Sequence, residues 1–188
     1  MRLFRQKAVV IAEDAGIELV MARPRQMQVV YRAATGIFLV NLDGTGKRPL
    51  SLEPGQTGEI VWSPTGRTLL YLHIPDDPKQ LITLRENYPD ENADREIART
   101  SQFASVASNG DASVFTGASR GKASAYVLIL LRVTRRELTL CEHRASDANM
   151  VSPLFTPDSQ SVVFVSDRHG KPALYQVKVE KFVEATQE

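Results

Sequence analysis

The chain has 188 residues, of which 43% are hydrophobic, enough to build the core of about one domain. Its 23 Lys and Arg residues nearly balance its 22 Asp and Glu residues, which argues against a nucleic-acid-binding surface built on bulk charge. The single cysteine, Cys141, rules out an intramolecular disulfide, and apolar runs such as 126–131 are far too short to span a membrane.

A polar turn followed by an apolar stretch that ends in an aromatic residue occurs four times along the chain. Aligned at the turn, at positions 26, 66, 110 and 159, the copies lie 40, 44 and 49 residues apart. Proline fixes φ in three of these turns, and Gly or Asp tolerates the unusual dihedral angles, so each copy is predicted to be a β-hairpin. The copies are residues 22–31, 62–71, 106–115 and 155–164.

Further strands are predicted to complete each hairpin. A third strand is expected at 36–42, 81–84, 125–130 and 173–179, and a fourth at 48–52, 96–100 and 137–141. Four strands every 40 to 49 residues come close to the period of a β-propeller blade. The sequence therefore predicts an all-β chain, a β-propeller of about four four-stranded blades, complete or partial. One domain spans 1–188, with blades near 22–52, 58–100, 101–144 and 150–180.

The segment between the third and fourth strands of the second blade has an alternative interpretation. Residues 91–99 can form a short helix by propensity, but such a helix would be isolated inside the repeat frame. We therefore interpret residues 85–95 as a long polar loop between strands, of the kind that often carries a binding site.

The alignment also predicts core positions and a way for the ring to close. Trp62, Val106 and Phe155 are expected to be equivalent residues packed between neighbouring blades. The last copy leaves few residues for an outer strand, whereas residues 8–12 form an apolar stretch without a partner. Because exposed edge strands invite aggregation, residues 8–12 are predicted to pair with the last blade of a closed ring, and an open array is expected to self-associate.

Two turns and the strand after the last one resemble a known repeat. The turns read Ser-Pro-Thr-Gly at 63–66 and Thr-Pro-Asp-Ser at 156–159. The last copy continues with Val-Val-Phe-Val-Ser-Asp-Arg at 162–168 and Gly-Lys-Pro-Ala-Leu-Tyr at 170–175. This order resembles the WD40-like PD40 repeat of TolB-type propellers, and the resemblance extends unevenly over residues 22 to 180.

The C-terminal half is most similar to the oligogalacturonate lyase propellers, through Leu-Cys-Glu-His at 140–143, Ser146 and the stretch 153–175. That resemblance implies a seven-bladed propeller with a manganese site, which cleaves uronate oligomers by β-elimination. The family's metal ligands include histidines in a His-Pro-His-Pro pattern, and the matching residues here, 150–153, are Met-Val-Ser-Pro. The resemblance implies a periplasmic location, whereas the chain as written, without a recognisable signal peptide, indicates the cytoplasm.

Candidate metal donors are few. Cys141 and His143 lie two residues apart on a predicted strand and so share a face, where Glu86 or Asp94 could join them from a loop. Two donors do not make a site, so the expected arrangement is a half-buried cysteine beside a strand-end histidine, with no metal and no cofactor. His169, in a turn, is expected to be exposed to solvent.

Catalytic groups are equally sparse. Ser63, Ser108 and Ser166 lie at turns or strand ends, where hydroxyl groups usually hydrogen-bond within the turn. The acidic residues between 76 and 94 are more typical of a solvated loop than of acid–base chemistry or calcium binding. Residues 44–47 copy part of a phosphate-binding loop but lack its upstream glycine. We therefore assign no catalytic residue.

One concentrated basic run remains, and it defines the predicted ligand surface. Arg132, Arg135 and Arg136 lie between two predicted strands, and His143 follows on the second strand. This run could contact an anionic sugar or an acidic partner, although a solvated turn would have a similar composition. The predicted function is a non-catalytic PD40/TolB-like propeller that binds a protein or an oligosaccharide, with no nucleic acid and no membrane insertion. The alternative is a polysaccharide lyase acting on uronate oligomers.

Overall fold

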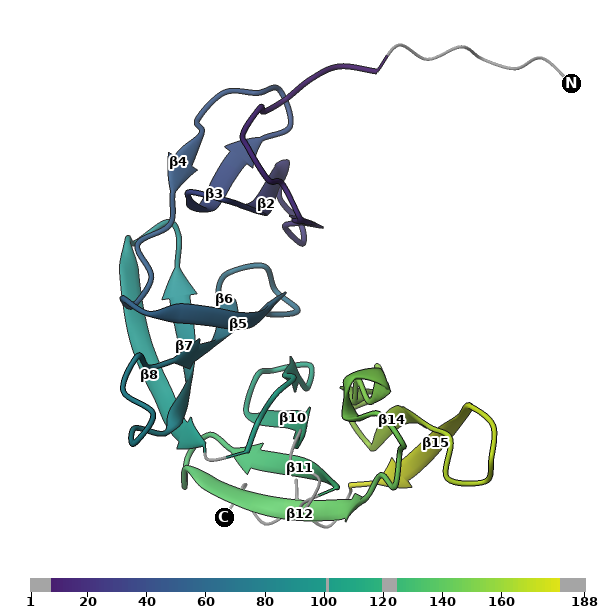
Figure 1. The fold of residues 1–188 in the computed structure, drawn as a ribbon. Helices are drawn as coiled ribbons and strands as arrows, with labels where there is room; N and C mark the ends of the chain where they lie inside the picture. Colours follow the sequence, from purple (N-terminus) through teal and green to yellow (C-terminus); the bar gives the residue numbers. More distant parts are fainter. Residues whose placement is uncertain (1–7, 101, 120–124, 180–188) are drawn as a thin grey trace, which may run out of the picture. The chain divides into compact units, whose positions relative to one another are not determined.

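Figure 1 shows a computed structural model of the chain, which describes residues 8–100, 102–119 and 125–179. Within these ranges the only helix is η1 (Ala148–Met150), a single 3-10 turn, and no described helix is long and apolar enough to cross a membrane. The predicted all-β fold is confirmed. The tail 181–188, which leaves few residues for an outer strand, lies outside the described residues.

Four antiparallel sheets follow one another along the chain, each a simple meander of the size of a propeller blade. In every sheet each strand pairs with its neighbour in sequence. The first sheet contains β1 (Leu19–Ala22), β2 (Gln28–Ala33), β3 (Gly36–Asn41) and β4 (Arg48–Pro49). The second contains β5 (Gln56–Trp62), β6 (Leu69–Ile74), β7 (Ile82–Tyr88) and β8 (Ala93–Thr100). The third contains β9 (Ala107–Ser108), β10 (Val114–Ala118), β11 (Tyr126–Leu131) and β12 (Arg136–Glu142). The last has three described strands: β13 (Leu154–Phe155), β14 (Ser161–Ser166) and β15 (Ala173–Lys178).

The chain divides into two compact units, and the first ends at Ser51. Its core is one face of the first sheet, where Tyr31 and Val40 are buried and Ile11 and Ala12 pack against them. The predicted strand at 8–12 does not form. Instead, the segment passes so close to the turn after β3 that a Cβ at Gly44 would lie 3.3 Å from the Ile11 carbonyl oxygen. Ile11 and Ala12 therefore cover their own sheet.

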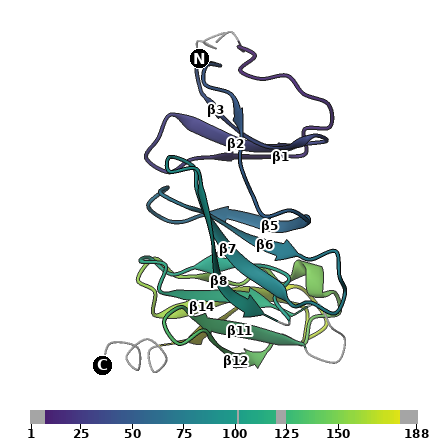
Figure 2. The ribbon, with the colours of Figure 1, turned by 90° about the vertical axis from the view of Figure 1, so that its left-hand side faces the viewer.

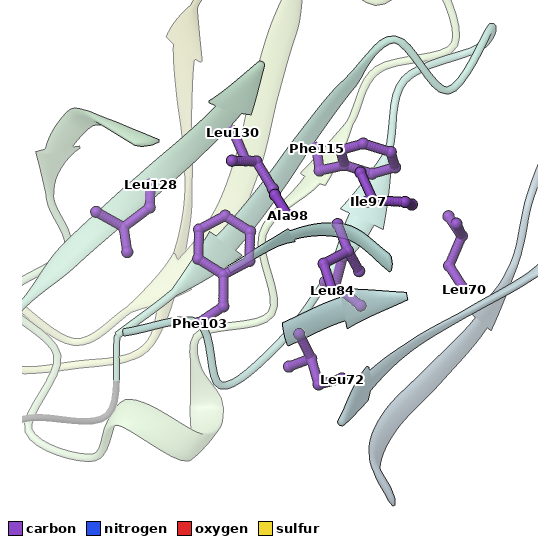
Figure 3. Close-up of a cluster of buried hydrophobic side chains, with 10 residues drawn as sticks. Leu70, Leu72, Leu84, Ile97, Ala98, Phe103, Phe115, Leu128 and Leu130 are labelled. Carbon is purple, nitrogen blue, oxygen red and sulfur yellow. The ribbon is translucent and has the colours of Figure 1, made fainter. Parts of the chain in front are cut away.

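The second unit, from Leu52 onward, holds the other three sheets, which follow each other in Figure 1; in Figure 2 the last strand of the second sheet, β8, lies toward the viewer. Two apolar layers join them. The layer between the second and third sheets is drawn in Figure 3, and its fully buried residues include Leu70, Leu84, Phe103 and Phe115. The layer between the third and last sheets includes Val127, Ile129, Val162 and Phe164. Alternating strand residues enter these layers, so burial on both faces fixes the register of β6, β10 and β11.

A common hydrogen-bonded frame closes the first turn of all four sheets. In the second sheet, the Ser63 N–H donates to the Thr68 carbonyl (2.9 Å) and the Gly66 N–H donates to the Ser63 carbonyl (2.8 Å). The N–H groups of Arg23, Asn109 and Thr156 bond in the same way to the carbonyl five residues later. One turn residue adopts positive φ in each case: Arg25, Gly66, Ala112 and Ser159. The repeat inferred from the sequence is thus a repeat of backbone geometry.

This frame shifts the predicted alignment of the third copy by two residues. Because Asn109 matches Ser63, the residue equivalent to Trp62 and Phe155 is Ser108, and the prediction for Val106 is wrong. Trp62, Ser108 and Phe155 each pair with the residue seven positions later. Val106 is nevertheless buried, as is Phe155, whereas Trp62 is only half-buried.

The predicted loop at 85–95 is also wrong. Residues 82–88 and 93–100 form the longest strand pair of the chain, with only four residues between them. The segment is polar because its side chains bond to one another: Arg85 Nε donates to Asp94 Oδ1 at 2.7 Å, and the Tyr71 hydroxyl donates to Asp94 Oδ2 at 2.9 Å. Satisfied polar pairs allow a strand of this composition to be buried.

Candidate ligand-binding site

A polar cleft of about 270 Å³ lies at the end of the second and third sheets where their paired hairpins turn. The turns after β5 and β9 form part of its wall, together with residues of β7 and β8 and the residue that follows β11. Loop tips set on a rigid sheet are common positions for binding residues. The lining residues are Ser63, Pro64, Thr65, Arg67, Thr68, Glu86, Tyr88, Arg95, Gly110, Asp111, Ala112 and Arg132.

An ion pair between two lining residues of the cleft links the two sheets. Arg132 Nη2 donates to Glu86 Oε1 at 2.6 Å, and the Tyr88 hydroxyl donates to the same oxygen at 2.9 Å. The Glu86 side chain is 6% exposed. Burial raises the pKa of the Tyr88 hydroxyl, and its hydrogen bond to Glu86 raises it further. Burial lowers the pKa of the Arg132 guanidinium, but its hydrogen bond to Glu86 and the electrostatic interactions with Glu86 and Tyr88 together outweigh this effect, and the pKa is raised.

The rim of the cleft carries two exposed arginines that both contact the ring of one tyrosine. The guanidinium of Arg95 lies 4.6 Å from the centre of the Tyr88 ring, and that of Arg67 lies 5.8 Å from it. Both arginines pair with Glu91, in the turn between β7 and β8, at 3.7 Å and 3.2 Å respectively. Cation–π contacts of this kind hold a guanidinium in place without neutralising it. Asp111 adds a carboxylate whose pKa is lowered by hydrogen bonds from Ser113.

The predicted ligand residues fall in two places. Arg132 lines the cleft, and Arg135 and Arg136 are exposed in the same hairpin, with Arg135 at a φ of 54°. His143 lies just beyond the other end of β12, seven residues from Arg136, and is only 2% exposed. A β-strand rises about 3.3 Å per residue, so His143 is about 20 Å away from these arginines. Arg132, Arg135 and Arg136 therefore remain a predicted ligand surface, and His143 lies too far away to be part of it.

Three contributors to the cleft were missed in the sequence: Arg67, Tyr88 and Arg95. Arg67 follows the Ser-Pro-Thr-Gly turn, where an arginine is not distinguished from other polar turn residues. Tyr88 and Arg95 lie in the segment interpreted as a loop. The spacing of Tyr88 and Arg95 in the sequence matches no motif. Their contact depends on the pairing of β7 with β8, which places Tyr88 opposite Ala93.

A larger hollow, of about 560 Å³, lies elsewhere in the second unit beside the loop between β6 and β7. Its buried polar groups already bond to each other. His73 Nε2 lies 2.9 Å from the Pro54 carbonyl oxygen, and Arg85 pairs with Glu53 at 2.8 Å as well as with Asp94. The polar groups of the hollow are therefore explained by bonds within the protein. In the smaller cleft, by contrast, the two rim arginines share the single carboxylate of Glu91.

Two of the three serine hydroxyls considered in the sequence, those of Ser63 and Ser166, have structural partners, as predicted. Ser63 Oγ accepts a hydrogen bond from the Thr68 N–H at 3.1 Å within its turn. Ser166 Oγ donates to the His143 carbonyl at 2.6 Å and accepts from the Arg168 N–H at 3.1 Å. The bond from the Arg168 N–H closes the Ser-Asp-Arg corner at 166–168. The bond to the His143 carbonyl ties that corner to the chain leaving the third sheet.

The described residues do not fit a manganese site. Among them, no three His, Cys, Asp or Glu side chains gather closely enough to hold a metal ion. The stretch Met150–Pro153, which matches the family's histidine pattern, offers no histidine, and Val151 is buried in the apolar layer. Cys141 is half-buried, and burial raises the pKa of its thiol, which disfavours the thiolate that metals bind.

The burial of His143 leads us to expect that the fold loses stability at acid pH. Burial lowers the pKa of its imidazole from 6.5, and the charge of Arg168 lowers it further, against an opposing hydrogen bond to the Ser119 backbone. Nδ1 accepts the Ala145 N–H at 3.0 Å, a bond that protonation would break. A histidine whose folded pKa is depressed stabilises the fold fully above about pH 6.5, and this stability is lost as the pH falls toward the folded pKa.

The measurement is the thermal midpoint of wild type and His143→Asn between about pH 8 and pH 5. The wild-type midpoint should fall more steeply below pH 6.5 than that of the variant, which retains an acceptor but cannot titrate there. His169→Asn, at an exposed position, serves as the control and should keep the wild-type slope. Parallel curves for wild type and His143→Asn would contradict the assignment.

The sheets and their turn frame define a β-propeller repeat, and comparison with known proteins confirms the predicted resemblance. An oligogalacturonide lyase of Pectobacterium atrosepticum is 25% identical over 167 residues, which span 76% of this chain and 42% of that protein. The solved oligogalacturonate lyase of Vibrio parahaemolyticus superposes with a TM-score of 0.82 at 23% identity, over 91% of this chain and 51% of its own.

TolB from Acinetobacter baumannii shares the fold more distantly, with a TM-score of 0.63 at 14% identity over 85% of this chain and 38% of its own. No protein-family model matches the sequence. The chain therefore has the fold of the TolB-type and oligogalacturonate lyase propellers, and it spans about half the length, or less, of these relatives.

Proposed function

We propose that this chain is a non-catalytic, TolB-like propeller module that binds an anionic oligosaccharide in the cleft between its second and third sheets. The observation that supports the proposal is the pair of rim arginines, Arg67 and Arg95, held beside the Tyr88 ring. Guanidinium groups bind carboxylates through charge-assisted, often bidentate hydrogen bonds, and an aromatic ring offers an apolar surface to a sugar. Arg135 and Arg136 add positive charge on the neighbouring hairpin.

Uronate oligomers are the ligands that fit this chemistry, because each sugar unit carries one carboxylate. The names of the lyases from Pectobacterium and Vibrio connect related propellers with oligogalacturonate. In the proposed function the protein binds such a uronate oligomer without cleaving it. An acidic segment of a protein is the second candidate, since its carboxylates would meet the same arginines.

Calorimetric titration of the full chain with galacturonate oligomers tests the proposal. The double variant Arg67→Gln/Arg95→Gln should bind at least about tenfold more weakly, because hydrogen bonds to charged groups contribute more than neutral ones. Arg144→Gln is the matched control: its side chain is 69% exposed, comparable to Arg67 at 73%, and it also pairs with a glutamate.

The same mixtures of protein and galacturonate oligomer also distinguish the proposed function from the lyase and from the protein-binding candidate. Absorbance from an unsaturated uronate product would overturn the non-catalytic function in favour of the lyase. If the chain instead binds a glutamate-rich peptide but no galacturonate oligomer, the protein-binding candidate replaces the oligosaccharide. Equal binding by wild type and the double arginine variant would remove the cleft as the site.

A further inference from the structure

Glu91 pairs with both of the arginines at the rim of the cleft. Its two oxygens divide between the rim arginines, with Oε1 at 3.2 Å from Arg67 Nη2 and Oε2 at 3.7 Å from Arg95 Nη2. Arg67 is 24 residues away in sequence, on the turn after β5, so Glu91 links two separate hairpins of the second sheet. One carboxylate thus serves two guanidinium groups.

Glu86 and Glu91, which both pair with arginines of the cleft, differ in burial and in the number of their bonds. Glu86 is 6% exposed and bonds to both Arg132 and Tyr88, so removing it would leave two half-buried polar groups without this partner. The Glu91 side chain is 45% exposed and lies in a four-residue turn. Ion pairs between exposed side chains contribute little to stability, so water or another anion can replace Glu91 at small cost.

The arginines would keep their positions after such a replacement. Arg95 lies over the Tyr88 ring at 4.6 Å, and Tyr88 is fixed in turn by its hydroxyl bond to Glu86. A guanidinium held by an aromatic ring loses less side-chain entropy when a new carboxylate binds. The rim is therefore already arranged for an anion when Glu91 leaves.

We propose that Glu91 is a built-in competitor, which occupies the arginine pair in the free protein and is displaced by a carboxylate of the ligand. The inference rests on the proposed function, because it concerns the same cleft and the same class of anionic ligand. Glu91 thereby sets the affinity of the site: it lowers binding of single carboxylates and favours ligands that present several of them, as uronate oligomers do.

Titration of galacturonate oligomers into Glu91→Gln tests this inference. The variant keeps the size of the side chain and removes its charge, so binding should be about three- to fivefold tighter than in wild type, and the gain should shrink as salt is added. Glu142→Gln is the matched control: Glu142 is 48% exposed and pairs with an exposed arginine, so its loss changes the net charge equally. It should leave the affinity unchanged.

The outcomes separate the inference from the proposed function. If wild type binds but Glu91→Gln binds equally or more weakly, the competitor role is overturned and the binding function stands. An equal gain in Glu142→Gln would attribute the effect to net charge and would also overturn it. If neither wild type nor Glu91→Gln binds, the proposed function fails, and the inference with it. A triple variant with Arg67→Gln and Arg95→Gln should lose the gain entirely.

Discussion

Replacing Gly117 with alanine is expected to lower the free energy of unfolding by about 3 kcal/mol, because no space exists for a side chain there. A Cβ at this position would lie 2.2 Å from the Ser105 carbonyl oxygen and 2.8 Å from Phe103 Cδ2. Neither neighbour can move freely. Phe103 is completely buried, and Ser105 Oγ accepts the Ala118 N–H at 3.0 Å. Gly117 therefore permits the close approach of the 103–105 segment to β10.

Chemical denaturation of wild type and Gly117→Ala measures the effect. Gly110→Ala is the control within the same sheet, since its added Cβ would meet only Ser159 Oγ, at 3.4 Å, and a side chain can yield where backbone cannot. Gly110→Ala should change the unfolding midpoint little. A similar midpoint for all three proteins would show that the approach of residues 103–105 to β10 is not as close as described.

Truncation of Phe155 to alanine is the second large effect, with an expected loss of about 3–5 kcal/mol. Phe155 is 9% exposed and belongs to the apolar layer between the third and last sheets, with Val162 beside it on β14. Removing its ring takes away buried apolar surface and leaves a cavity that the surrounding sheets can fill only in part.

Leu154 offers a control one residue away in the same strand. It faces the opposite side of the sheet and is 52% exposed, so Leu154→Ala should cost far less than Phe155→Ala. Thermal or urea unfolding of both variants gives the comparison. Equal losses would mean that the last sheet does not pack on the third through the face that carries Phe155.

Much of this fold could be predicted from the sequence because each sheet repeats a local signal. A proline-containing turn followed by β-branched and aromatic residues defines a hairpin wherever it occurs, and Ser63 and Thr156 close these turns as their residue types suggest. The third copy was misaligned because its turn has no proline. There the side chain of Asn109 accepts the Val114 N–H at 3.1 Å and replaces the hydroxyl.

The site was less predictable, because it depends on contacts between hairpins. Arg132 could be found from its place in a basic run, but its partner Glu86 is 46 residues away. The second half of β7, residues 85–88, falls within the predicted loop because local composition does not reveal that its charges are paired with residues on other strands. Tertiary pairing of Arg85 with Asp94 and of Glu86 with Arg132 overrides the local preference. Contacts of this kind need the strand register, which the sequence does not supply.

The turn frame separates the scaffold of this protein from its chemistry. The bonds that close each turn lie at its base: the side chains of Ser63, Asn109 and Thr156 each receive the N–H five residues later, at 3.1 Å in all three cases. The tips at 64–67, 110–113 and 157–160 are therefore not required for the base bonds. The side chains of each tip can therefore change in charge, size or hydrogen-bonding groups while the strands below keep their register, provided that the tip keeps its positive-φ residue, Gly66, Ala112 or Ser159. A new ligand preference could then be installed by rewriting a few tip residues, leaving the apolar layers untouched.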